Sequence, residues 1–295
     1  MASQNEIHIA NPADDKIRIN DYLIGVFTSI PSRKSIKKAI RKERILINGQ
    51  IARSGTWVEE GMRIELVEDD PTKFPNYELD LQVVYEDDYF AIVNKPAGLV
   101  SSGNQLRTLQ NAVAANLKAS AKEDAIYPPK LVHRLDSATS GLIIVAKNAE
   151  SVRILGQMLE KQQIKKKYLA IVIGDSKEND RIDKKIHDKE ALSILIKKEA
   201  LRSEKFGMLS LVELYPQSGR THQLRIHMAE NNHPILGDRL YGNRVHDLKG
   251  KGLFLVALGL EFDHPASGNK MKFEIPMPKK FQKYWDGLRK RSTSS

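Results

Sequence analysis

The sequence contains no cysteine, and this absence excludes several kinds of chemistry. Without thiols the chain forms no disulfides, builds no thiolate metal site and performs no thiol catalysis. It also lacks the HExxH pattern of zinc hydrolases, the phosphate-binding P-loop and the GxGxxG dinucleotide fingerprint. We therefore expect a reaction that needs neither a metal nor a cofactor.

Long apolar segments are also missing, while positive charge is in excess. No apolar run approaches the length of a membrane span, and the polar start MASQN has no signal-peptide core. We therefore expect a cytoplasmic protein with no membrane partner. Lys and Arg number 47 against 37 Asp and Glu, a formal net charge of +10. Such a surplus is typical of proteins that bind polyanions such as RNA, although a basic protein without such a partner stays possible.

The richest stretch of polar chemistry is at residues 133–141, which read HRLDSATSG. Its glycine opens the apolar run 142–145, which predicts a buried strand with the polar cluster at the edge of a sheet. Asp136 is the candidate for the acting group. A simpler reading is that Asp136 caps the turn and pairs with a nearby arginine, as lone aspartates usually do.

Four further segments accompany this stretch: NKPAGL at 94–99, KYLA at 167–170, GRTHQLRIH at 219–227, and HPILGD at 233–238 followed by Tyr241-Gly242. Together they resemble the RluA-type family of RNA pseudouridine synthases, over roughly residues 80 to 280. The resemblance implies an isomerase that converts specific uridines of structured RNA to pseudouridine. One segment departs from the family pattern. Residues 100–103 read VSSG where the family often has His-Pro, which affects how this loop meets RNA rather than the catalytic residues.

The reaction of this family breaks the bond from ribose C1′ to uracil N1, turns the base and rejoins it through C5. It needs one ionised carboxylate beside the sugar, acting as nucleophile or base, and Asp136 suits that role. The resemblance implies that Arg225 pairs with Asp136 and keeps it ionised. It also implies that Tyr168 stacks on the uracil and assists with the C5 proton.

The remaining predicted contacts surround the target base. Leu135, Leu224 and Ile226 are candidates for the pocket wall, and Arg220 is a further candidate for substrate binding. Arg134 is interpreted as an RNA contact that helps to flip the uridine out of its stack. Flipping costs on the order of a few kcal/mol, which phosphate contacts from a basic surface offset.

Several of these assignments have simpler alternatives. A tyrosine at the start of an apolar strand, such as Tyr168, is more often a core residue. Arg225 could pair with any surface carboxylate instead of Asp136. His222, His227 and His233 suggest a metal site, but the first two are five residues apart and lie on different faces of a helix. We therefore interpret the three histidines as packing or RNA-facing residues.

Two rival functions remain open. A nucleoside hydrolase usually has two carboxylates flanking the bond, whereas the strongest motif here offers only Asp136. Asp238, in a separate segment, is better suited to brace the turn 237–242. A non-catalytic RNA-binding or ribosome-assembly protein with the same fold is the second rival. Such a protein would have lost Asp136, Tyr168 or Arg225, all of which are present.

The N-terminal region reads as a small unit of its own. Residues 1 to about 15 are polar, and we expect them to be loose. Asn20 is predicted to cap a short helix that carries Phe27. Ser32 is predicted to cap a second helix from residue 33 to about residue 44.

Positive charge concentrates on this second helix. Ile36 and Ile40 face one way, and within the helix only Glu43 opposes the cations that fill the other positions. Because nothing local offsets their repulsion, we predict that they bind RNA phosphates, although a helix kept for solubility is the alternative. The seven candidate RNA-binding residues are Arg33, Lys34, Lys37, Lys38, Arg41, Lys42 and Arg44.

An Asn48-Gly49 pair predicts a tight hairpin turn, and a strand is expected at 62–66. With the two helices, this pattern resembles the S4 RNA-binding domain, which we place at 15–68. A polar linker at 69–77 and a catalytic domain at 78–290 follow. Because S4 domains bind ribosomal RNA, that RNA is the favoured partner and tRNA the second. We expect a monomer.

Apolar runs of strand length recur in the catalytic region, with helical patterns between them. Strands are expected near residues 81–85, 90–93, 142–145, 169–173, 209–214 and 253–260. Helices are expected near residues 106–117, 150–163, 221–230 and 277–291, the second of them ending in the lysines 165–167. Because no regular βαβ alternation occurs, we predict an α+β fold with a mixed, mostly antiparallel sheet.

Overall fold

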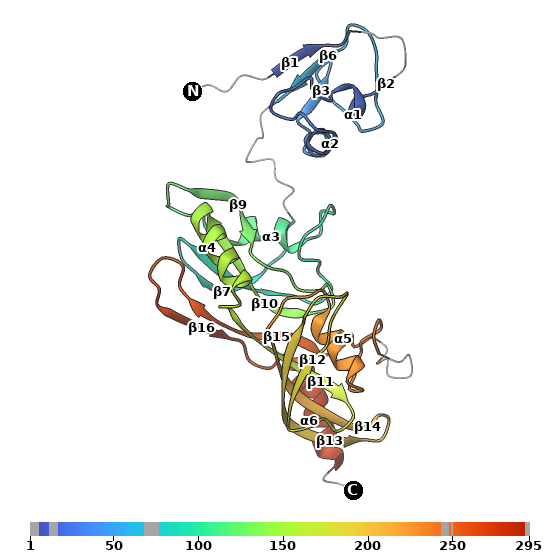
Figure 1. The fold of residues 1–295 in the computed structure, drawn as a ribbon, viewed down its shortest axis with the longest axis vertical. Helices are drawn as coiled ribbons and strands as arrows, with labels where there is room; N and C mark the ends of the chain where they lie inside the picture. Colours follow the sequence, from blue (N-terminus) through green and yellow to red (C-terminus); the bar gives the residue numbers. More distant parts are fainter. Residues whose placement is uncertain (1–5, 12–16, 68–76, 243–247, 249, 293–295) are drawn as a thin grey trace. The chain divides into compact units, whose positions relative to one another are not determined.

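The structure is a computed structural model that describes residues 6–11, 17–67, 77–242, 248 and 250–292. Contacts divide the chain into two units, Met1–Phe74 and Pro75–Ser295 (Figure 1). Each unit has its own buried hydrophobic residues. The predicted linker at 69–77 lies outside the described residues except for Tyr77.

The first unit packs short helices against a four-stranded sheet of order β1-β6-β3-β4. Its strands are β1 (Glu6–Ile9), β3 (Ile45–Ile47), β4 (Gln50–Ile51) and β6 (Arg63–Leu66), and β2 (Ile17–Arg18) pairs separately with β5 (Trp57–Val58). The expectation that residues 1 to about 15 are loose was wrong for β1. This strand pairs with β6 along its length and provides hydrogen-bond partners for backbone N–H and C=O groups of β6 that would otherwise be unpaired at the edge of the sheet.

The predicted hairpin turn and strand are confirmed in this unit. Asn48 and Gly49 connect β3 to β4 with φ angles of 48° and 79°. Positive φ at both central residues is the geometry of a type I′ turn, which suits the twist of paired strands. The predicted strand at 62–66 is β6.

The prediction for Asn20 was wrong. The first helix, α1 (Ile19–Tyr22), is a single turn that ends well before Phe27, and Asn20 is buried within it. The Asn20 side-chain amide donates to the Ser54 carbonyl at 2.7 Å. It therefore ties α1 to a neighbouring loop instead of capping the helix.

The prediction for Ser32 is confirmed. Ser32 Oγ accepts from the Ser35 backbone N–H at 3.2 Å, and Ser35 Oγ accepts from the Ser32 N–H at 3.0 Å, which forms a capping box. The helix α2 (Arg33–Arg41) ends earlier than predicted. Arg44 consequently lies outside it, and its guanidinium donates to the Val67 carbonyl at 2.9 Å.

The second unit is built on a ten-stranded sheet of order β12-β13-β14-β11-β15-β10-β8-β7, with β16 on β15 and β9 on β10. The strands are β7 (Gln82–Glu86), β8 (Phe90–Lys95), β9 (Ala125–Leu131), β10 (Ser140–Asn148), β11 (Lys165–Ile173), β12 (Asn179–Asp183), β13 (Leu192–Ser203), β14 (Gly207–Pro216), β15 (Leu255–Asp263) and β16 (Lys270–Glu274). Among the named pairs of this sheet only β10 and β15 run parallel. This confirms the predicted α+β class with a mixed, mostly antiparallel sheet.

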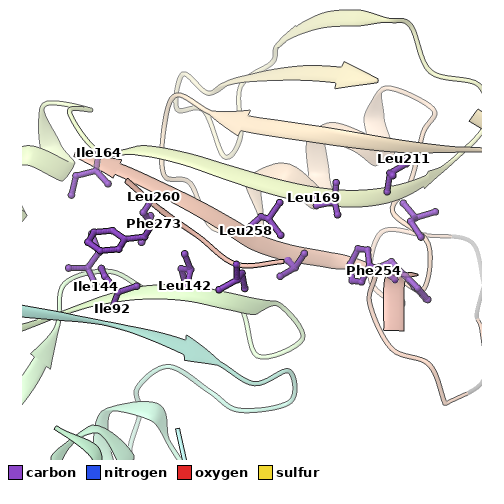
Figure 2. Packing of buried hydrophobic residues seen from close by; sticks show 14 of the residues in the cluster. Ile92, Leu142, Ile144, Ile164, Leu169, Leu211, Phe254, Leu258, Leu260 and Phe273 are labelled. Atoms are coloured by element: carbon purple, nitrogen blue, oxygen red, sulfur yellow. The ribbon is translucent and has the colours of Figure 1, made fainter. Parts of the chain in front are cut away.

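Helices cover both faces of this sheet. They are α3 (Leu109–Asn116), α4 (Ala149–Glu160), α5 (Gln223–Glu230) and α6 (Lys279–Ser292), which confirms the four predicted helices. On β10, Leu142 and Ile144 pack in the cluster that includes α4 and α6 (Figure 2). Ile143 and Val145 pack in the cluster that includes α3. Both faces are buried, which explains the unbroken apolar runs. Across the described residues, no helix is long and apolar enough to cross a membrane.

One predicted helix end needs correction. The lysines 165–167 do not end α4, which stops at Glu160, but begin β11. Gln162 adopts a left-handed φ of 58° in the connection, and Lys165 then pairs with Glu261 of β15. Strand pairing therefore overrides the helical pattern at this point.

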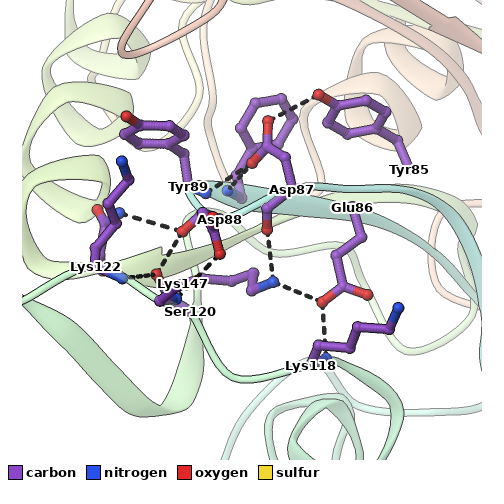
Figure 3. Close-up of polar contacts among 12 residues, drawn as sticks. Tyr85, Glu86, Asp87, Asp88, Tyr89, Lys118, Ser120, Lys122 and Lys147 are labelled. Carbon is purple, nitrogen blue, oxygen red and sulfur yellow. Dashed lines mark hydrogen bonds and ion pairs between the residues drawn. The ribbon is translucent and has the colours of Figure 1, made fainter.

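A polar network holds the turn between β7 and β8 (Figure 3). The Asp87 carboxylate accepts hydrogen bonds from the Tyr89 backbone N–H at 2.7 Å and from the Tyr85 hydroxyl at 2.8 Å. Lys147, which is only 2% exposed, pairs with Glu86 at 2.7 Å. The network fixes β7 and β8 beside β10, the strand that follows the Asp136 turn.

Candidate active site

Asp136 lies in the turn that connects β9 to β10. The Thr139 N–H donates to the Asp136 carbonyl at 3.1 Å and closes the turn. Gly141 follows with a φ of 118°, and a Cβ at this position would collide with the Ala257 carbonyl oxygen of β15. Only glycine permits this close approach, so the turn is anchored at the parallel contact between β10 and β15.

A buried lysine ties this turn to the loop after β8. Lys95 is 0% exposed, and its Nζ donates to the carbonyls of Leu99 at 2.7 Å, Pro96 at 3.0 Å and Ser137 at 3.3 Å. Burial lowers the pKa of Lys95 to about 8, and the negative charge of Asp136 acts against that shift. The NKPAGL segment therefore holds the aspartate turn in place.

The VSSG segment at 100–103, which departs from the family pattern, also contacts the Asp136 turn. Ser101 is 2% exposed, and its Oγ both donates to the Leu135 carbonyl at 2.7 Å and accepts from the Leu135 N–H at 3.0 Å. One side chain thus satisfies both backbone groups of the residue before Asp136. The sequence linked this segment only to RNA contact, whereas the structure places it behind the Asp136 backbone.

Arg225, on α5, bridges two carboxylates. Its Nε and Nη2 donate to the two Asp238 oxygens, both at 2.8 Å, and its Nη1 donates to Asp136 Oδ2 at 3.3 Å. Burial disfavours the charged guanidinium, but Asp238 and then Asp136 outweigh it, so the pKa of Arg225 is raised. The guanidinium remains a fixed positive charge beside Asp136.

Asp238 braces the turn 237–242, as predicted. Its Oδ1 accepts from the backbone N–H groups of Leu240 at 2.9 Å and Tyr241 at 3.2 Å. Burial alone would raise the pKa of Asp238, but the hydrogen bonds and charge of Arg225 lower it. With its side chain only 1% exposed and both oxygens engaged, Asp238 is not available to flank a glycosidic bond as a second carboxylate.

His222 also approaches Asp136, a placement that sequence reasoning missed. It precedes α5 with a left-handed φ of 55°, and its Nε2 lies 3.6 Å from Asp136 Oδ1. Its Nδ1 lies 2.8 Å from the Tyr241 hydroxyl, and the Arg225 guanidinium stacks 5.2 Å from the centre of the Tyr241 ring. The only sequence signal was the position of His222 within the GRTHQLRIH segment.

The other two histidines have structural roles. His227 is 0% exposed, with Nδ1 2.9 Å from Ser193 Oγ and Nε2 3.0 Å from the Lys184 carbonyl. The Nδ1 of His233 lies 3.0 Å from the Ile173 carbonyl. No group of three or more potential metal ligands occurs among the residues that the structure describes.

Asp136 opens onto a cavity of about 880 Å³ in the second unit. The predicted catalytic and substrate-binding residues that line it are Asp136, Tyr168, Arg225, Arg134, Leu135, Leu224 and Arg220. Ile226 is not brought to this wall, because two residues of helix turn it about 200° away from Leu224. The seven predicted RNA-binding cations lie in the first unit.

Tyr168, on β11, is half-buried at this cavity. Burial raises the pKa of its hydroxyl, and the charge of Asp136 acts in the same direction. The hydroxyl therefore stays protonated at neutral pH. No hydrogen bond to it is found within the described residues, so it is free for a ligand.

His133, the first residue of the HRLDSATSG stretch, was also not predicted to line the cavity. Its Nε2 accepts the Ile144 backbone N–H at 3.1 Å, which requires an unprotonated nitrogen. Burial, followed by the positive charge of Lys166, lowers the pKa of His133 to about 3. The imidazole is therefore neutral at physiological pH.

Known proteins with similar sequences show the family to which this chain belongs. Residues 89–230 match a family model described as RNA pseudouridylate synthase, and this range includes Asp136, Tyr168 and Arg225. An RNA pseudouridine synthase of Aquifex aeolicus, itself uncharacterised, is 31% identical over 93% of this chain and 95% of its own length. The chain belongs to the RNA pseudouridine synthase family.

Two further similarities concern this synthase. The ribosomal large subunit pseudouridine synthase D of Xanthomonas campestris is 31% identical over 88% of this chain and 86% of its own length. Human RNA pseudouridylate synthase domain containing 1 shares the fold, with a TM-score of 0.55 and 22% identity over 71% of this chain and 95% of that one. The synthase is accordingly an isomerase of the pseudouridine synthase fold.

Proposed function

We propose that this synthase converts uridines of large-subunit ribosomal RNA to pseudouridine, with Asp136 acting on the ribose. The observation that carries this assignment is the approach of Arg225 to Asp136 at 3.3 Å inside the cavity. The Asp136 side chain is 18% exposed, so a substrate can reach it while a permanent cation stays beside it. The name of the Xanthomonas campestris relative supports ribosomal RNA over tRNA.

The reaction requires that the bond between C1′ and N1 breaks and a bond between C1′ and C5 forms. The proton on C5 is lost and N1 gains a proton, so no oxidant or water is consumed. Asp136 acts as nucleophile at C1′ or as base toward the ribose, and Arg225 favours its ionised form. The two hydrogen bonds that Arg225 donates to Asp238 fix the plane of its guanidinium, so its third nitrogen is already aimed at Asp136.

Tyr168 supplies the platform for the base. A phenol offers a flat apolar face for stacking and a polar tip, and the protonated hydroxyl of Tyr168 is placed to donate a hydrogen bond as the uracil turns. Leu135 and Leu224 line the same cavity and exclude water from the reacting sugar. Exclusion of water protects the reaction from hydrolysis while the base is detached.

The first unit supplies RNA affinity in this proposal, as an S4-like module. Lys34, Lys37 and Lys38 on α2 are exposed and have no acidic partner among the described residues. The expectation that nothing local offsets the charge of this helix is wrong for Arg33, which pairs with Asp21 at 2.9 Å. The unpaired lysines remain suited to phosphate contacts.

Tritium release tests the function directly. The purified protein is incubated with a transcript of bacterial large-subunit ribosomal RNA carrying 5-³H-uridine, and in parallel with labelled tRNA transcripts. We expect release from the ribosomal transcript, followed by mapping of the modified positions. Release from tRNA alone would reassign the substrate, and release from neither would favour a non-catalytic RNA-binding protein.

A further inference from the structure

Three consecutive lysines at the start of β11 differ in how their charge is balanced. Lys165 Nζ lies 2.8 Å from Glu261, and Lys167 Nζ lies 2.9 Å from Glu274. Lys166, between them, has no carboxylate partner in the described part of the chain. Because successive side chains of a strand point to opposite faces, Lys166 is directed away from the pairs that serve its neighbours.

Lys166 instead faces the catalytic cavity. It lines that cavity together with Tyr168, two residues further along β11. Its Nζ passes over Gly219, where a Cβ would lie 3.9 Å from it. Burial lowers the pKa of Lys166, and no carboxylate acts against that shift. The site therefore holds a partly desolvated cation whose charged form an incoming anion would stabilise.

The rest of the cavity leaves this charge unbalanced. Asp136 is already paired with Arg225, and Glu160, another carboxylate at the wall, has no cation within ion-pair distance among the described residues. His133 is neutral and adds no competing charge. The cations that line the cavity without a carboxylate partner in the described ranges are Lys166, Arg134 and Arg220.

We propose that Lys166 binds a backbone phosphate of the target nucleotide. The inference rests on the proposed function, because it places a uridine on Tyr168. Two residues of strand separate Lys166 from Tyr168 by about 7 Å, a distance on the scale of one nucleotide. Phosphate contacts position a nucleic acid without reading its sequence. Lys166 therefore fixes the sugar against Asp136 whichever sequence surrounds the uridine.

The test compares Lys166→Met, Lys166→Arg and the control Lys161→Met. Lys161 is an exposed lysine at the end of α4, outside the cavity lining, and its loss changes the net charge equally. The probe is the 5-³H-uridine ribosomal transcript. At low salt we expect Lys166→Met to lower kcat/KM by about 10- to 100-fold, the effect of losing one charged hydrogen bond. Lys166→Arg should retain most of the kcat/KM of the unaltered enzyme, and Lys161→Met should retain nearly all of it.

A salt series separates phosphate binding from a structural role. Each neutralised phosphate contributes about 0.7 to 0.9 to the slope of log affinity against log salt, so Lys166→Met should flatten the slope by about that amount. The same slope is measured from RNA binding if turnover is too slow to follow. An unchanged slope with a lowered rate would overturn the phosphate contact, as would a slope that Lys161→Met flattens equally.

A chemically altered RNA locates the contact. In a short fragment containing a mapped uridine, the phosphate on its 5′ or 3′ side is replaced by an uncharged methylphosphonate. One of the two replacements should lower kcat/KM of the unaltered enzyme and have little further effect on kcat/KM of Lys166→Met. If both replacements instead lower kcat/KM of the variant as much as that of the unaltered enzyme, the inference is contradicted. An unaltered enzyme that releases no tritium from any RNA would contradict the proposed function itself, which keeps the two failures distinct.

Discussion

Arg225 serves two aspartates that differ in exposure and in task. Asp238 is 1% exposed at its side chain and holds Arg225 with two hydrogen bonds, whereas Asp136 is 18% exposed and receives one longer bond at 3.3 Å. The buried partner is the better satisfied of the two, so it sets the orientation of the guanidinium. The exposed partner keeps lone pairs free to act on a substrate.

Asp238→Asn tests this division through pH. The pKa of Asp238 is lowered in the folded protein, so its stabilisation is complete above the unfolded value near 4. It is lost as pH falls through the lower folded pKa. Breaking a buried pair costs about 3–5 kcal/mol, so Asp238→Asn should lower the free energy of unfolding by that order at pH 7.

Urea unfolding at a series of pH values provides the measurement. The difference between the two proteins should begin to shrink below about pH 4, where the unfolded chain takes up a proton on Asp238, and should vanish below the lower folded pKa, where the folded carboxylate is also neutral. A difference that stays constant down to acid unfolding would show that Asp238 contributes through packing and not through its charge.

At the scale of elements, two loops from different parts of the chain position the carboxylate. The end of β8 supplies Lys95 and the loop after it supplies Ser101, and the turn before β10 presents their acceptors at Ser137 and Leu135. These contacts join segments more than thirty residues apart, as the 34-residue separation of Ser101 and Leu135 illustrates. The geometry of Asp136 therefore depends on two side chains that are not part of the cavity lining.

Ser101→Ala should lower kcat with little change in KM. It leaves the buried N–H and carbonyl of Leu135 without their partner, at a cost of about 1–3 kcal/mol each. Part of that cost appears as a turn that holds Asp136 less rigidly. The matched control is Ser102→Ala, which removes an exposed hydroxyl next along the chain and should leave tritium release unaltered. Equal kinetics for both variants would remove Ser101 from the positioning of Asp136, and restored turnover by Ser101→Thr would support it.

The strands differ in how well the sequence predicts them. β8, β10, β11, β14 and β15 were predicted because burial on both faces makes their sequences continuously apolar. β9, β12, β13 and β16 were missed. β9 contains Pro128 and Pro129, which are tolerated because β9 is an edge strand that pairs only with β10 among the described strands. β13 contains the charged residues Lys197 and Lys198, which interrupt its apolar pattern.

The candidate site was predictable to a similar degree. The HRLDSATSG stretch indicated Asp136, and the family resemblance implied Tyr168 and Arg225; all three line one cavity. The sequence did not predict that Arg225 is shared with Asp238 or that His222 approaches Asp136 at 3.6 Å. Both depend on how α5 and the segments at its two ends pack against the Asp136 turn, which is a tertiary relation that local pattern does not encode.

At the scale of the whole molecule, the cavity that holds Asp136 and the basic helix α2 belong to different units. The cavity and every residue that lines it lie in the second unit, which has its own cores. Lys34, Lys37 and Lys38 of α2 lie in the first. We therefore expect a chain that lacks residues 1–74 to retain the single-turnover rate at saturating RNA while binding RNA more weakly.

The salt dependence of binding gives this expectation a magnitude. If Lys34, Lys37 and Lys38 each neutralise one phosphate, removing the first unit flattens the slope of log affinity against log salt by about 2 to 3. Replacing the same three lysines by Gln in the full chain should give the same change and serves as the control for deletion. An unchanged slope would mean that α2 is only a solvated surface, and a collapsed single-turnover rate would mean that the first unit helps to build the active site.

The central claim is that Asp136 performs the chemistry, and Asp136→Asn tests it most directly. Asn is nearly isosteric but does not ionise, so it neither attacks C1′ nor accepts a ribose proton. Single-turnover tritium release from the 5-³H-uridine ribosomal transcript should fall below detection, while RNA binding stays within a few-fold of the unaltered enzyme. Residual release within tenfold of the unaltered enzyme would contradict the assignment of Asp136 as the catalytic carboxylate.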